Sequence, residues 1–158
     1  MRIEKSHKAA FMVIGLKTNT TNANESNPET ALIPGLWQQF FSENIESQIP
    51  NITDANTILG VYWDYEGENE KSYNLLAGRE VSSLQDIPVE MTGIKVPESD
   101  YLVFSEEGDM PSVIYSLWDS VQGYFSENKN ILRKYSYDFE CYNTNNSSRV
   151  DIYISVKS

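Results

Sequence analysis

One order of elements, a strand, a helix and two further strands, occurs twice along this chain. Short apolar runs rich in β-branched residues predict the strands, and apolar residues spaced three and four apart predict the helices. The first copy comprises residues 11–16, about 34–47, 57–65 and 73–81, and the second comprises residues 101–104, a helix opened by Pro111, 135–142 and 149–156. This repeat predicts a single α+β domain over residues 1–158, with β-α-β-β half-domains at about 1–82 and 98–158. Their strands would form an antiparallel sheet, with two helices and a central ligand groove between the halves.

The segments between these elements are interpreted from their composition. Residues 17–28 are rich in Thr, Asn and Ser and predict a flexible surface loop. The first strand is expected to begin near Ile3, residues 66–71 to form an acidic hairpin turn, and residues 88–97 to be extended and irregular, with apolar side chains that could cover an opening. Gly60 and Gly78 interrupt strand patterns, which predicts a bulge or a close backbone approach at each.

The charge of the chain narrows the classes of partner. It carries 23 acidic and 12 basic residues, a formal net charge of −11. Binding to nucleic acid or to an anionic membrane surface depends on positive charge, so neither is expected as a direct partner. A single cysteine, Cys141, and a single histidine, His7, exclude an internal disulfide and a zinc cluster, and no cofactor is expected. The N-terminus has no secretory signal and no apolar run is long enough to span a bilayer, so we expect a cytoplasmic protein.

The last-but-one predicted strand has a carboxylate at its apolar centre. Successive side chains of a strand point to opposite faces, so Phe139 and Cys141 share one face while Asp138, Glu140 and Tyr142 share the other. The second face is either solvent, where a glutamate is unremarkable, or a cavity, where Glu140 lies among aromatic side chains without a partner. The residues of this strand alone leave both readings open.

A set of short motifs in a fixed order resembles the GyrI-like small-molecule-binding family, which is similar to the effector-binding domains of AraC-type and multidrug-responsive transcription regulators. The motifs are Phe11-x-Val13-x-Gly15-Leu16, Leu36-Trp37-x-x-Phe40, Leu59-Gly60-Val61-Tyr62-x-Asp64-Tyr65, Tyr73-x-x-Leu76-Ala77-Gly78-x-Glu80-Val81, Tyr101-x-Val103-Phe104, Trp118 and Asp138-Phe139-Glu140-x-Tyr142. They extend from about Ile3 to the C-terminus. The resemblance implies a groove for small hydrophobic, often cationic, molecules.

The resemblance also implies roles for particular residues. Glu140 would lie in the groove and recognise charge, and the candidates for the aromatic wall are Tyr62, Trp63, Trp37, Trp118 and Tyr142. A carboxylate in an apolar cavity is penalised unless it is paired, and a lipophilic cation would relieve that penalty while its apolar surface is buried against rings. The ordinary alternatives are a solvent-facing Glu140, and core roles for Trp37 and Trp118, which share helical spacing with Leu and Phe.

Three functions follow as hypotheses. The first is a stand-alone binding domain for hydrophobic or cationic molecules, a sensor or sequestering protein. Because the strand pattern begins almost at Met1, no helix-turn-helix is expected, and any transcriptional effect would need a separate protein partner. The second is a hydrolase of electrophilic small molecules with Glu140 as general base, since a raised pKa suits that task. The third is an acidic protein-interaction module whose surface charge attracts a basic partner.

Overall fold

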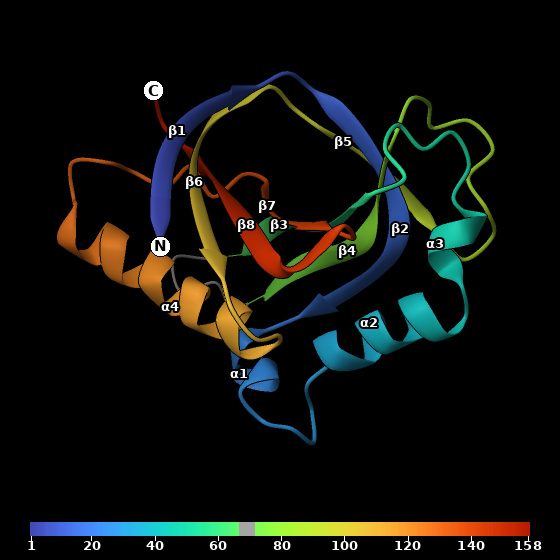
Figure 1. Ribbon diagram of the computed structural model, residues 1–158, viewed down its shortest axis with the longest axis horizontal. Coiled ribbons are helices and arrows are strands. Elements are labelled where there is room, and N and C mark those ends of the chain that lie inside the picture. The colour runs from blue at the N-terminus through green and yellow to red at the C-terminus, as the bar shows by residue number, and fades with distance from the viewer. Residues whose placement is uncertain (67–71) are drawn as a thin grey trace.

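The structure is a computed structural model that describes residues 1–66 and 72–158, and within those ranges eight strands form one antiparallel sheet (Figure 1). The spatial order is β1-β6-β8-β7-β3-β4-β2-β5. The strands are β1 (Arg2–Lys8), β2 (Phe11–Thr20), β3 (Thr57–Glu66), β4 (Ser72–Val81), β5 (Thr92–Val96), β6 (Ser99–Glu107), β7 (Asp138–Asn143) and β8 (Asn146–Val156). The helices are α1 (Asn22–Glu25), α2 (Ile33–Ser42), α3 (Ile45–Gln48) and α4 (Ser112–Glu127). The predicted α+β class is confirmed.

The sheet is built from two similar halves that meet at its centre. Strands β2, β4 and β3 lie on one side and β6, β8 and β7 on the other, and β3 pairs with β7 across the middle. Each half has one further strand that precedes the four predicted elements in sequence, β1 in the first half and β5 in the second. Each of these strands pairs with the other half: β1 pairs with β6, and β5 pairs with β2. The outer strand of each half is therefore contributed by the other half.

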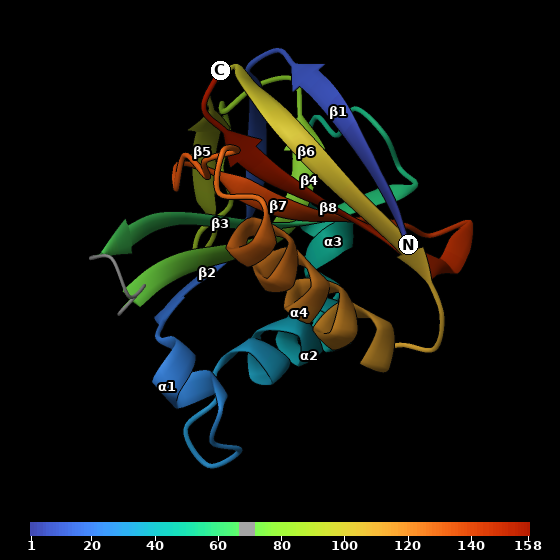
Figure 2. The same cartoon turned by 90° about the vertical axis from the view of Figure 1, so that its left-hand side faces the viewer.

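Both long helices lie against the same face of the sheet (Figure 2). Helix α2 buries Leu36 and Phe40 on β2, β3 and β4, while α4 buries Val113, Leu117 and Val121 on β6 and β8. The spacing of three and four residues that predicted these helices is the spacing of the buried stripe. Each fully buried side chain of this size contributes about 1.5–3 kcal/mol, which anchors each helix to its own half.

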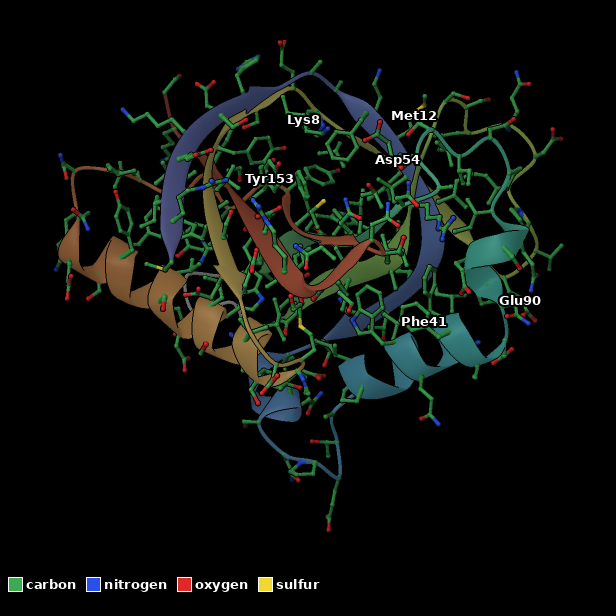
Figure 3. The ribbon with its side chains drawn as sticks, viewed as in Figure 1. Lys8, Met12, Phe41, Asp54, Glu90 and Tyr153 are labelled. Atoms are coloured by element: carbon green, nitrogen blue, oxygen red, sulfur yellow. The ribbon has the colours of Figure 1, made fainter. Side chains whose placement is uncertain are left out.

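The opposite face of the sheet curves around a second core. Figure 3 places Tyr153 inside this curve, on the side away from the two helices. Its ring stacks on Phe139 with centroids 4.4 Å apart, and Tyr101 meets Phe139 edge-on at 5.4 Å. Strands from both halves contribute side chains to this core, which fills the concave side of the sheet. The pocket therefore lies on the other face, which carries the helices.

Near the N-terminus, two expectations are corrected. The strand expected from Ile3 to residue 16 is two strands, because the chain turns at Ala9 and Ala10 and crosses from one half of the sheet to the other. Most of residues 17–28 form regular structure rather than a loop: β2 continues to Thr20 by pairing its polar residues with β4. Helix α1 follows, with the Thr21 hydroxyl accepting a hydrogen bond from the Asn24 N–H at 3.0 Å. Strands pair through backbone hydrogen bonds, which polar side chains do not prevent, so the polar composition of this segment wrongly indicated a loop.

Three other boundaries also differ. The helix expected over residues 34–47 stops at Ser42, since Asn44 has a left-handed backbone, and α3 restarts at Ile45. Part of the segment 88–97, expected to be irregular, is the edge strand β5. Strand β7 begins at Asp138 rather than at Tyr135, which has a positive φ of 54°. Residues 67–71 of the expected acidic turn lie outside the described residues.

The predicted close approach at Gly78 is confirmed. A Cβ atom there would lie 2.3 Å from the carbonyl oxygen of Ile14 on the neighbouring strand, so only glycine fits this crossing. Across residues 1–66 and 72–158, no helix combines the length and the apolar character that crossing a membrane requires.

Candidate ligand pocket

A pocket of about 830 Å³ opens between α2 and α4, over the central pair β3 and β7. Its lining is mostly apolar and aromatic. The described lining residues are Asn22, Glu25, Ala31, Ile33, Pro34, Trp37, Phe41, Ile58, Tyr62, Tyr65, Tyr73, Met110, Pro111, Ile114, Tyr115, Trp118, Gln122, Arg133, Glu140, Tyr142, Asn143, Thr144 and Ser147. Both half-domains contribute, as the repeated order of elements predicts for a groove between them. The volume is within the range of small-molecule sites.

Glu140 lies at the base of this pocket and is only 3% exposed. Its Oε2 accepts hydrogen bonds from the Tyr62 hydroxyl at 2.8 Å and the Trp118 indole N–H at 2.7 Å. Its Oε1 accepts one from the Tyr142 hydroxyl at 2.8 Å. The three donors come from β3, α4 and β7, so the carboxylate joins the sheet centre to one of the two helices. The solvent-facing reading of Glu140 is wrong.

The donors that the described part of the chain directs at Glu140 are all electrically neutral. Within residues 1–66 and 72–158, no basic side chain forms an ion pair with this carboxylate. Burial raises the pKa of Glu140, and the bonds from Trp118, Tyr142 and Tyr62 oppose that rise. Burial and the adjacent carboxylate raise the pKa of Tyr62 and of Tyr142 well above the ordinary phenol value, so both hydroxyls remain protonated donors.

Gly60 makes room for this arrangement. It is directly opposite Glu140 in the β3–β7 register. A Cβ atom at Gly60 would lie 3.0 Å from Glu140 Oε1 and 3.0 Å from Cζ2 of Trp37. The sequence predicted a bulge or a close approach here, and the close neighbours are the pocket's own side chains.

Of the six residues expected at the site, five line the pocket: Glu140, Tyr62, Trp37, Trp118 and Tyr142. Trp37 meets Tyr142 edge-on with centroids 5.8 Å apart, and Trp118 meets Tyr62 edge-on at 5.4 Å. These rings pack into the cores under the helices and also line the cavity. Each tryptophan is therefore both a core residue and part of the pocket wall.

Trp63 is the exception. It follows Tyr62 in a regular part of β3, so it points to the other face of the sheet, where it stacks on Tyr137 with centroids 6.2 Å apart. The expectation that Trp63 forms part of the wall is therefore wrong. Strand alternation excludes two adjacent residues from one wall, and that signal was already in the sequence.

Tyr65 is a lining residue that the sequence analysis did not select, and strict alternation would put it on the face opposite Tyr62. A bulge corrects the alternation: between Trp63 and Glu66 the register with β4 shifts by one residue, and Asp64 has a φ of 62°. Tyr65 is thereby brought to the pocket face. Aspartate tolerates this backbone better than most residues, which is the one local signal that could have indicated the bulge.

The mouth of the pocket combines exposed apolar side chains with one carboxylate. Phe41 on α2 is 50% exposed and Tyr115 on α4 is 63% exposed. Glu25 at the end of α1 accepts hydrogen bonds from the backbone N–H groups of Leu32 and Ile33 at 2.9 and 3.1 Å, which fixes α1 to the start of α2. Part of the segment expected to be a loop is therefore a wall of the site.

An apolar pocket of this volume with a few convergent polar groups, set on a sheet of two exchanged halves, is typical of a small-molecule-binding protein. A family model for the integron-associated effector binding protein Cass2 matches residues 3–156, and the chain belongs to this family. The expected GyrI-like relationship is confirmed. Proteins of this kind bind small molecules in connection with regulation.

Three known proteins illustrate the relationship. An integron cassette protein from the mobile metagenome of Vibrio cholerae is 32% identical, with a TM-score of 0.82 over 98% of this chain and 95% of that one. A protein of Bacillus subtilis (strain 168) that bears the name of a transcriptional regulator, YobU, is 27% identical over 148 residues, which cover 90% of each chain. The structure of SAV2435 bound to tetraphenylphosphonium shares the fold, with 22% identity, a TM-score of 0.79, and coverage of 100% of this chain and 95% of that one.

Proposed function

We propose that this protein binds a lipophilic cation in the pocket between α2 and α4, with Glu140 as the charge partner. The observation that carries the proposal is a buried carboxylate at the base of an aromatic cavity, which among residues 1–66 and 72–158 is held only by neutral donors. Such a charge is stabilised poorly by the protein itself, so a cation that enters the pocket compensates it.

The neighbouring groups suit this mode of binding. Tyr62, Trp118 and Tyr142 donate to Glu140 and hold its carboxylate still, which reduces the entropy that a ligand must remove. Each ring face over the cation adds about 0.5–2 kcal/mol. Because hydrogen-bond donors are directed at Glu140 while the wall is apolar, the pocket selects charge and bulk rather than a particular pattern of polar groups.

SAV2435 supports the choice of ligand class, since that protein shares this fold and holds tetraphenylphosphonium. The Cass2 family and the regulator name of YobU support a role in which binding is linked to transcription. We propose a sensor or sequestering protein that acts through a separate protein partner rather than through DNA itself.

The proposal is tested by calorimetric titration with a matched pair of ligands of similar shape: the cation methyltriphenylphosphonium and the neutral triphenylphosphine oxide, in which an oxygen atom replaces the methyl group. We expect the cation to bind at least about tenfold more tightly, because only the cation compensates Glu140. Equal affinities would refute charge recognition.

The same preparation distinguishes binding from hydrolysis, for which Glu140 would act as general base. Activated aromatic esters are incubated with the wild-type protein and with Glu140→Ala. We expect both to leave the esters at the uncatalysed rate. Turnover by the wild type that the variant loses would replace the binding proposal with an enzyme.

A further inference from the structure

Strand β7 carries two buried carboxylates on the face that bears the pocket, Asp138 and Glu140. They are 0% and 3% exposed. Being two residues apart on one strand face, they lie about 7 Å from each other along the chain. Yet their partners differ in charge, and that difference bears on which ligands the pocket accepts.

Asp138 is neutralised by the protein itself. Its Oδ2 accepts hydrogen bonds from the Arg133 guanidinium at 2.8 Å and from the Tyr65 hydroxyl at 2.6 Å. Its Oδ1 accepts two more from Ser155, from the backbone N–H at 2.8 Å and the hydroxyl at 3.0 Å. Four donors, one of them cationic, satisfy both oxygens of this carboxylate.

Arg133 also separates Asp138 from the cavity. Arg133 and Tyr65 line the pocket, whereas Asp138 does not. The guanidinium carbon lies 4.3 Å from the ring centroid of Tyr135 and 6.0 Å from that of Tyr65, so the cation is held against two rings while it pairs with Asp138. Among the described residues, a second positive group entering this end of the pocket would meet Arg133 and not a free carboxylate.

Glu25 is the third carboxylate at the pocket. It lies at the mouth, is partly exposed, and both of its oxygens accept hydrogen bonds. Its partners include the first N–H groups of α2, which favour a negative charge. Among the described acidic groups of the pocket, Glu140 alone is buried and without either a cation or a helix N-terminus beside it.

We infer that Arg133 is a specificity-determining residue that limits the pocket to ligands with one positive charge, by neutralising and covering Asp138. The inference rests on the proposed function, in which Glu140 binds the cation. It assigns the ligand class more narrowly, to lipophilic monocations. Because Arg133 acts through Asp138, its effect must depend on the presence of that carboxylate.

The wild-type protein provides the first test. Benzyltrimethylammonium and p-xylylene-bis(trimethylammonium) differ by a second quaternary nitrogen on one benzene ring, and each is used to displace tetraphenylphosphonium at about 0.3 M salt, which screens the long-range field of the acidic chain. We expect the dication to bind no more than twofold tighter, the statistical factor for two equivalent nitrogens. A larger preference for the dication overturns the inference.

Variants supply the second test. In Arg133→Gln the ratio of dication to monocation affinity should rise about tenfold, because Asp138 becomes available to the second nitrogen. Adding Asp138→Asn should abolish that rise, and Glu43→Gln, at the exposed end of α2 and outside the pocket, should leave the ratio unchanged in either background. A ratio that does not move in folded Arg133→Gln, or a rise that survives Asp138→Asn, contradicts the inference.

These experiments distinguish a failure of the proposed function from a failure of the role assigned to Arg133. If Arg133→Gln does not fold, Asp138→Asn alone serves, since removing the negative charge of Asp138 beside Arg133 should weaken monocation binding, and unchanged binding would count against the inference. A wild-type protein that binds neither cation would refute the proposed function. Monocation binding that depends on Glu140, together with an unmoved ratio, would refute only the role of Arg133.

Discussion

Replacing Glu140 by glutamine separates the binding role of this residue from its cost to the fold. The substitution keeps the size of the side chain and an acceptor oxygen for Tyr62 and Trp118, while it removes the charge. The Tyr142 hydroxyl, which now donates to Oε1, can turn to accept a bond from the new amide. Packing is therefore preserved, and the measured change reports on charge.

The magnitude follows from the geometry of the site. A bulky cation in the pocket brings its charge centre to about 4–6 Å from the carboxylate, where an effective dielectric constant of about 20 gives roughly 3–4 kcal/mol of attraction. The affinity of Glu140→Gln for tetraphenylphosphonium should therefore fall about 100- to 1,000-fold. The free energy of unfolding of the ligand-free protein should stay the same or rise by about 1 kcal/mol or more, because removing a buried carboxylate that has no described cationic partner is neutral or stabilising.

The assay combines calorimetric titration with thermal denaturation of the ligand-free protein. Glu43→Gln, at the exposed end of α2, is the matched control and should change neither quantity. A folded Glu140→Gln protein whose affinity falls less than threefold would refute charge recognition. A loss of affinity that accompanies a large loss of stability would show that Glu140 is structural instead.

Three further outcomes are expected. Because burial raises the pKa of Glu140, the ligand-free protein should lose stability as pH rises from the unfolded-state pKa of this group through its folded-state pKa, while its affinity for the cation rises over the same window. Denaturation and ligand titration at several pH values should therefore show opposite slopes, and parallel slopes would contradict the assignment. Gly60→Ala places a Cβ 3.0 Å from Glu140 and from Trp37 and should weaken cation binding about tenfold, by about 1.4 kcal/mol, with unchanged affinity as the contrary result. Burial raises the pKa of the partly buried Cys141 thiol to about 11, so alkylation at pH 8 should be slow in the native protein and fast in denaturant, and rapid native labelling would show that the fold does not suppress the thiolate.

Part of the site could be predicted before any tertiary structure was known. Alternation along residues 138–142 separated Phe139 and Cys141 from Glu140 and Tyr142, and the structure has that division. Helical spacing and the family resemblance brought Trp37 and Trp118 to the same groove as Tyr62. Whether these five residues bind a ligand stays a prediction. Their placement follows from periods of two and 3.6 residues, which are properties of the backbone.

The misplaced and missing residues have a different origin. The family resemblance implied a wall position for Trp63, whereas alternation along β3 puts this residue on the face opposite Tyr62, so a local rule already excludes it. Tyr65 reaches the pocket through a one-residue bulge at Asp64, which depends on how β3 pairs with β4. The pairing of Arg133 with Asp138 joins an irregular segment to a strand, and no periodic pattern marks such a contact.

The local sequence determined which residues form strands and helices, which face each side chain takes in a regular element, and that the elements come in two similar sets. Only the tertiary structure decided that the halves exchange β1 and β5, and that within residues 1–66 and 72–158 a cation pairs with Asp138 and none with Glu140. The physical reason is the range of the interactions. A backbone repeat is set by neighbours a few residues away, whereas strand exchange and the partner of a buried charge depend on segments brought together only when the whole chain has folded.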